Sequence, residues 1–175
     1  MGRNESAIFA RGHGACTAYV GVASLRSLDV SGSGDARVHG SAQGLAAVSA
    51  SGSGNVDVDD LAADAARLSA TGSGDVAVRS LRARAVAVDV SGSGNLLAAG
   101  VADHVTLSSS GSGGVEARRL AAGDAQVESS GSGDVALTAT LRARVESSGS
   151  GDVTVAGRAP ERHAHHSGSG DVRFE

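Results

Sequence analysis

The stretch Ser-Gly-Ser-Gly-Asp-Val-Ala-Leu at residues 130–137 decides the fold, because close copies of it recur along the chain of 175 residues. The motif Ser/Thr-Gly-Ser-Gly begins at Ser31, Ser51, Thr71, Ser91, Ser110, Ser130, Ser148 and Ser167, at intervals of 18 to 20 residues. Twenty residues before Ser31, residues 11–14 keep both glycines and predict a degenerate first copy. Nine copies at this spacing indicate a repeat architecture in which each repeat stacks on the next.

Apolar residues alternate on both sides of each motif, which is the pattern of a half-buried β-strand. Residues predicted to face inward on this basis are Leu28, Val30, Val56, Val58, Val76, Val78, Val86, Val88, Val90, Val135, Leu137, Val153 and Val155. A third apolar column is predicted in the middle of the repeat, at Leu61, Leu81, Val101 and Leu120. Each repeat is therefore expected to form a strand, a glycine-rich turn, a second strand, a corner and a short third side.

The same pattern argues against helices and against antiparallel hairpins. Two glycines in every repeat cost roughly 1 kcal/mol each in a helix interior, and hairpins need a turn signal every 8–12 residues or so. The sequence predicts an all-β, single-stranded parallel β-helix, or β-solenoid, of about nine coils of roughly 20 residues. It is expected to be right-handed, by the usual chirality of parallel crossovers. Residues 1–10 are predicted to form an N-terminal segment or cap, and residues 11–175 the repeat domain.

The motif itself suits the corner of a solenoid. Glycine is predicted there because it tolerates a positive φ and lets successive corners approach closely. The serines can bond backbone groups or serines in adjacent coils. The residue that follows the motif, at Asp35, Asn55, Asp75, Asn95, Asp134, Asp152 and Asp171, suits an Asx-type cap of the turn. A column of Ca²⁺ sites along these residues is the alternative, but Asn55, Asn95 and Gly114 interrupt the carboxylates and the calcium-binding nonapeptide period is missing.

Few residues suggest chemistry, and no catalytic, cofactor-binding or metal-binding residue is predicted. The register places Cys16 in an inward slot, which favours a small buried side chain over a nucleophile. His163, His165 and His166 cluster in the last coil, where a solvated face or corner is favoured over a Zn²⁺ or Ni²⁺ site. His13, His39 and His104 share no column, and no nucleophile-elbow motif supports a catalytic triad.

Composition excludes several classes of function. The net charge is −4 and no basic stripe or aromatic platform appears, so we expect no nucleic-acid binding. One cysteine leaves no intramolecular disulfide, and no apolar run approaches the length of about 20 residues that a membrane span needs. The opening Met1-Gly2-Arg3-Asn4-Glu5-Ser6 lacks a signal-peptide pattern, which leaves a cytoplasmic location or a missing start as expectations.

The repeated Ser-Gly-Ser-Gly-Asp-Val at residues 130–135, 148–153 and 167–172 resembles the putative auto-transporter adhesin head domains, also called the GIN domain family. The segment Gly157-Arg158-Ala159-Pro160 is similar to the Gly-x-Pro segment near the end of that family. The resemblance covers about residues 11–175. It implies a β-helical protein of the bacterial cell envelope or an exported protein, without established catalytic residues.

We therefore expect a non-catalytic structural or adhesive module whose partner is a cell-surface protein or a polysaccharide. A self-assembling scaffold that stacks end to end is the alternative, and a carbohydrate-active β-helix enzyme is a distant third. The Arg and Asp residues at Arg79, Arg82, Arg84, Asp57, Asp59 and Asp60 are read as a solvated face, with a flat ligand-binding side as the other possibility. Because the repeats differ in length by at most two residues, no loop long enough to build a cleft is expected.

Overall fold

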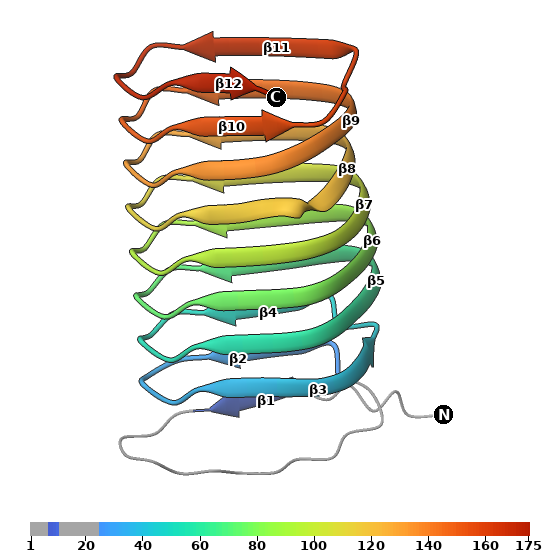
Figure 1. Ribbon diagram of the computed structural model, residues 1–175. Helices are drawn as coiled ribbons and strands as arrows, with labels where there is room; N and C mark the ends of the chain where they lie inside the picture. The colour runs from blue at the N-terminus through green and yellow to red at the C-terminus, as the bar shows by residue number, and fades with distance from the viewer. Residues whose placement is uncertain (1–6, 11–24) are drawn as a thin grey trace.

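The computed structural model describes residues 7–10 and 25–175 and forms a stack of parallel coils (Figure 1). The elements are β1 (Ala7–Ala10), β2 (Ser27–Val30), β3 (Ala36–Gln43), β4 (Ala47–Ala50), β5 (Val56–Ala70), β6 (Val76–Val90), β7 (Leu96–Ser109), β8 (Val115–Ser129), β9 (Val135–Ser147), β10 (Val153–Ala156), β11 (Glu161–His166) and β12 (Val172–Phe174). All strand pairs among these elements are parallel. The predicted all-β parallel solenoid is confirmed.

Each long strand bends around a corner and so supplies two sides of a coil. In β5 and β6, Val56 pairs with Val76 and Leu68 with Val88, twenty residues apart along the chain. Figure 1 shows the chain climbing with its nearer strands running to the right and its farther strands returning to the left, which is a right-handed coil.

The predicted number of nine coils was too high, and the structure has about seven turns of about 20 residues. The difference arises at the two ends of the repeat region. The expected first coil falls largely on residues 11–24, which lie outside the described residues. The last motif, which begins at Ser167, opens a coil that contains only the three-residue strand β12. The division into residues 1–10 and 11–175 stays a prediction, although β1 already pairs in register with β2.

The core is a narrow column of small aliphatic side chains inside the stack. The inward residues predicted from alternation, from Leu28 to Val155, are all buried. Leu61, Leu81 and Leu120 are also buried, as expected of the third column. Val101 was predicted wrongly: its side chain is 55% exposed. Gly100 takes the place in the column, because it pairs with Leu81 on one side and with Leu120 on the other.

The turn glycines are required by close approach between coils. A Cβ at Gly72 would lie 1.8 Å from the carbonyl oxygen of Gly52, and one at Gly74 would lie 2.0 Å from that of Gly54. The prediction of positive φ at these corners was wrong for the described motif glycines other than Gly32, whose φ is 108°. Backbone hydrogen bonds such as Ser73 N to Gly52 O, at 2.9 Å, join successive turns. The turns therefore stack in contact, and only glycine leaves room for the oxygen below.

Asp and Asn side chains join each coil to the next at the residue after the motif. The backbone N–H of Asp75 donates to Asn55 Oδ1 at 2.9 Å, and that of Asn95 donates to Asp75 Oδ1 at 2.7 Å. The same bond recurs at Asn55, Gly114, Asp152 and Asp171, whose N–H groups each donate to the preceding coil. The expected cap of the residue's own turn is thus replaced by a ladder between coils, because the next amide lies directly above the side-chain oxygen.

Candidate ligand-binding surface

A depression opens on the outer face of the solenoid over β7. It has a volume of about 760 Å³ and is lined by residues of β6, β7 and β8. Its exposed floor is apolar and consists of Ala77, Leu97 and Ala99, and the Leu97 side chain is 43% exposed; Ala98 also lines the depression, but it is buried in the core. No charged residue lies between Leu97 and Ala102, whereas β5, β6 and β8 all carry charges in the matching segment.

The depression exists because this segment of β7 is shorter than its neighbours. Ala98 pairs with Val78 and Gly100 with Leu81, so Ala99 alone spans the space that Arg79 and Ser80 span in β6. On the other side the register shifts again, since Leu97 pairs with Glu116 and Ala99 with Arg119. Both neighbouring strands therefore bulge above β7, as expected where one strand has an extra residue. The prediction from sequence considered only clefts built by long loops, whereas this depression arises from a missing residue.

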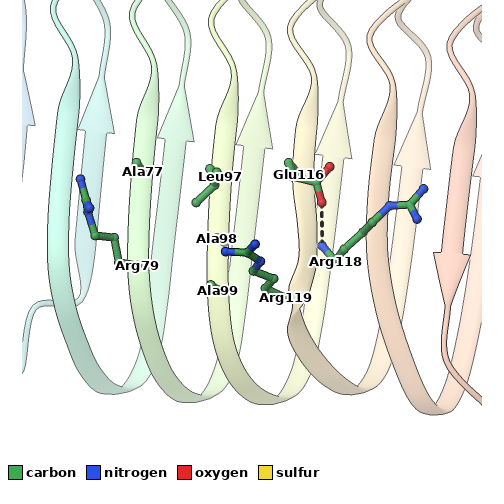
Figure 2. A pocket seen from close by; sticks show the side chains of 8 residues that line it. All are labelled: Ala77, Arg79, Leu97, Ala98, Ala99, Glu116, Arg118 and Arg119. Carbon is green, nitrogen blue, oxygen red and sulfur yellow. Dashed lines mark hydrogen bonds between the residues drawn. The ribbon is translucent and has the colours of Figure 1, made fainter.

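Three arginines border the depression, and they point in different directions (Figure 2). Arg79 Nη2 lies 2.6 Å from Asp57 Oδ2 on β5, and Arg118 Nη1 lies 3.2 Å from Glu175 Oε2. In Figure 2, Arg118 extends away from the depression, whereas Arg119 leans over Ala98 and Ala99. Within residues 25–175, Arg119 has no carboxylate within 4.0 Å.

Glu116 is the only acidic residue in the lining of the depression. Its Oε1 accepts a hydrogen bond from the backbone N–H of Arg118 at 3.2 Å, the contact drawn as a dashed line in Figure 2. The carboxylate is therefore held against the bulge of its own strand. The hydrogen bond leaves the negative charge of Glu116 in place at the β8 edge of the depression, and the guanidinium of Arg119 is the charge that leans over the floor.

The strands β5 and β6 present a different surface, in which every charge on this side has a partner. The pairs are Arg79 with Asp57, Arg82 with Asp60 and Arg84 with Asp64, with the last two at 3.4 and 3.6 Å. Hydrogen bonding and charge attraction from Arg79, together with Arg37, hold the pKa of Asp57 below its ordinary value, although partial burial opposes this shift. The same contact raises the pKa of Arg79. The prediction of an ordinary charged face fits this part of the solenoid.

A second charge ladder crosses four coils on another side of the stack. His104 Nδ1 lies 3.3 Å from Asp124 Oδ2, Arg142 Nη1 lies 3.5 Å from the same oxygen, and Arg142 Nε lies 2.7 Å from Glu161 Oε2. The hydrogen bond to Glu161 and the charge of Asp124 raise the pKa of Arg142. Sequence reasoning did not find this ladder because its members stand 18 to 20 residues apart in segments where the register shifts.

The residues considered for metal chemistry are now placed, except those at the N-terminal end. Cys16 and His13 lie outside the described residues. His163, His165 and His166 all lie on β11, whose six residues are exposed, and His39 Nδ1 contacts Asp59 Oδ2 at 3.1 Å. In the part of the chain that the structure describes, no three His, Cys, Asp or Glu residues are grouped as metal ligands. Each Asp or Asn of the Asp/Asn ladder uses one side-chain oxygen to accept a hydrogen bond from an amide of the next coil. The Ca²⁺ hypothesis did not anticipate this use of the oxygens.

Three polar side chains lie inside the stack beside the turns. Ser109, Ser129 and Ser147 occupy successive coils in the inward position that Val90 holds in β6, and each is at most 3% exposed. Their hydroxyl groups have no hydrogen-bond partner among the described residues. Because these positions alternate with the outward ones, the three serines belong to the core and not to the depression.

None of the described residues forms a helix long and apolar enough to cross a membrane.

Comparison with known proteins finds one family whose model matches most of the chain. A family model for the putative auto-transporter adhesin, head GIN domain, matches residues 3–159. A crystal structure of a putative adhesin from Bacteroides fragilis NCTC 9343 is similar, with a TM-score of 0.71 and 27% sequence identity. The match covers 75% of this chain and 61% of the adhesin, so the chain spans less than two thirds of that protein's length. No curated protein matches the sequence.

Proposed function

Because the chain belongs to the family of the putative auto-transporter adhesin, head GIN domain, we propose that it is a non-catalytic adhesive module of the bacterial cell envelope. The similar protein from Bacteroides fragilis is itself described as a putative adhesin. In this role the solenoid is a rigid support, and side chains on its outer faces contact a cell-surface protein or a polysaccharide. Stacked repeats suit this task because they present extended binding surfaces.

The observation that carries the proposal is the combination of a closely stacked solenoid with a depression on its outer face. Glycine contacts, the Asp/Asn ladder and the buried column of aliphatic residues fix each coil on the next. Against this regular background, the depression over β7 exposes an apolar floor and a free guanidinium. Its lining offers arginine, alanine, leucine and one glutamate that is already bonded to its own strand. These groups suit recognition better than they suit acid–base or nucleophilic catalysis.

Adhesion of coated beads tests this proposal. The protein carries a biotin at its C-terminus, is attached to fluorescent beads, and is applied to bacterial cells, to epithelial cells and to immobilised polysaccharides. We expect retention on at least one of these surfaces that soluble protein competes away. Beads that carry an unrelated solenoid of similar charge are the control. Equal retention of both bead types on all surfaces would contradict an adhesive role.

The same polysaccharides separate adhesion from the carbohydrate-active alternative. Incubation with the protein is expected to release no new reducing ends and no unsaturated sugar products. Release of either product at a rate that scales with protein concentration would favour the enzyme.

A self-assembling scaffold remains the second candidate, and β11 is the observation that favours it. This strand is exposed along its whole length, and among the described strands it pairs only with β9. An edge with unpaired backbone groups can accept a strand from a second copy. Light scattering across a hundredfold range of concentration distinguishes the candidates, because a scaffold grows in mass with concentration and a monomeric adhesive module does not.

A further inference from the structure

The outer surface of the solenoid changes character at β7. From Asp57 to Ala62, β5 carries three aspartates, and from Ala77 to Arg82, β6 carries two arginines that pair with them. The matching segment of β7, Leu97–Ala102, has no charge, and its Leu97 and Val101 side chains are 43% and 55% exposed. The β7 segment therefore exposes apolar side chains where β5 and β6 carry paired charges.

Arg119 adds a single cation to this apolar floor. In the pairing of strands β7 and β8, Arg119 lies opposite Ala99, and its guanidinium leans toward Ala98 and Ala99 (Figure 2). Arg79 and Arg118 are directed away from the floor by Asp57 and Glu175. A guanidinium presents a planar fork of donors that matches a carboxylate, and it is weakly hydrated, so it suits recognition beside apolar surface.

We propose that the depression binds an extended peptide segment of a partner protein. The segment carries a carboxylate side chain and, two residues away on the same face, an aliphatic side chain. The carboxylate contacts Arg119, and the aliphatic side chain packs on Leu97 and the alanines of the floor. This inference rests on the adhesive role proposed above and names the chemistry of its partner.

A peptide fits this surface better than an acidic polysaccharide does. Sugar rings pack most effectively on aromatic side chains, and the lining of the depression contains none. Leu97 instead offers aliphatic surface, which matches a leucine or valine side chain. In an extended peptide, residues i and i+2 lie on one face about 7 Å apart. A single strand can therefore place an acid over Arg119 and a leucine over Leu97.

The test uses the whole chain and four fluorescein-labelled peptides. The probe is Ser-Glu-Ser-Leu-Ser-amide with fluorescein on its N-terminus, and the controls replace Glu with Gln, Glu with Lys, or Leu with Ser. Polygalacturonate is included as a carboxylated polysaccharide. Affinity is measured by fluorescence anisotropy, and amide chemical shifts in nitrogen-15 spectra identify the residues that each ligand contacts.

Two protein variants and one matched control locate the site. Arg119→Gln is expected to weaken binding of the acidic peptide about fivefold or more, because it removes a charge-assisted contact. Leu97→Ser is expected to weaken it about threefold, because it removes part of the apolar floor. Arg84→Gln is the control, since Arg84 is an arginine of β6 that already faces Asp64, and its affinity should match that of the unchanged protein. Circular dichroism and melting temperature show whether each variant is folded.

The outcomes are distinct. Binding of the acidic probe above its three controls, with shifts at residues 97–99 and loss in Arg119→Gln, supports the proposal. The proposal is overturned if the peptides bind equally in Arg119→Gln and Arg84→Gln, or if only polygalacturonate binds. It is also overturned if the acidic peptide does not bind at all. In each of these cases bead adhesion can still be measured, so an adhesive role without this site remains distinguishable from no adhesive role.

Discussion

The coils β5–β6 and β7–β8 stack in the same way but differ in local backbone register and in surface. On β5–β6, arginines lie over aspartates and leave no charge uncompensated on that side. On β7–β8, the segment Leu97–Ala102 is one residue shorter than its neighbours and carries no charge, and Arg119 leans over it without a carboxylate partner among residues 25–175. The comparison teaches that in a solenoid the core and the turns set the fold, whereas the outward residues of a single coil can change the function of the surface without disturbing the stack.

The largest effect is expected from a substitution of Gly100, the glycine that allows β7 to be one residue shorter than its neighbours. Gly100 has a φ of 141°, and a Cβ there would lie 1.9 Å from the carbonyl oxygen of Leu81. Gly100→Ala should therefore lower the free energy of unfolding by on the order of 2–4 kcal/mol, measured by chemical denaturation.

Gly114→Ala is the matched control for this change. A Cβ at Gly114 would meet its nearest atoms at 3.4 and 3.5 Å, which is ordinary contact. We expect its stability to stay within about 0.5 kcal/mol of the unchanged protein. Equal losses in the two variants would show that the short coil does not depend on Gly100.

The second test fills the depression. Insertion of one serine between Ala98 and Ala99 gives this segment of β7 the same length as β6, so its backbone should rise level with Arg79 and Ser80. We expect the acidic peptide to bind about tenfold more weakly, which corresponds to about 1.4 kcal/mol of binding free energy. The measurement is fluorescence anisotropy. Ala99→Ser introduces the same hydroxyl without the extra residue and should retain binding; weakened binding there would instead implicate floor polarity.

The third test removes the compensation from β5–β6. Asp57→Asn takes away the closer of the two carboxylates beside Arg79 and leaves only Asp59 Oδ1, at 3.9 Å, so this arginine is freer to act as a second cation at the edge of the depression. Affinity for the acidic peptide should rise about two- to threefold, as expected for one exposed charge. An unchanged affinity would mean that Arg79 does not reach the ligand.

The same substitution has a defined pH dependence. Arg79 and Arg37 hold the pKa of Asp57 below its ordinary value in the folded protein, so the ionised side chain adds stability above the unfolded pKa of about 3.9. That contribution is lost as the pH falls through the lower folded-state pKa. The melting temperatures of the two proteins should differ most near neutral pH and converge in strong acid. A difference that grows on acidification would contradict this assignment.

The smallest effect is expected from adding a side-chain acceptor at Gly114, the residue before β8 where the Asp/Asn ladder is interrupted. Gly114 has no side chain for the backbone N–H of Asp134, whereas the neighbouring coils supply an oxygen at this position. Gly114→Asn should raise the free energy of unfolding by about 0.5–1.5 kcal/mol, the net value of one hydrogen bond. Thermal and chemical denaturation measure the effect. A loss of stability would indicate that the backbone at Gly114 does not accept a side chain.

The sequence predicted the features that repetition controls. The spacing of the motif predicted the parallel stack, and alternation predicted the inward valines and leucines, because both depend on rules that repeat in every coil. The register of Val101 was mispredicted because counting from the motif ignores a residue missing before Gly100. The 19-residue interval between Ser91 and Ser110 was the signal of that shift. The site could not be inferred further from sequence, because it depends on which neighbouring charges are already paired.

The Asp/Asn ladder gives the stack a direction. Each side-chain oxygen accepts the amide of the following coil, never that of the preceding one, in all six contacts of the described residues. A chain that is synthesised from its N-terminus therefore meets, at each new turn, an acceptor already fixed on the finished coil beneath it. Growth from the other end would have to order the amide before its acceptor existed. The order in which these groups are synthesised therefore matches the direction of the ladder, and only the step from Gly114 to Asp134 lacks a side-chain acceptor within this run of coils.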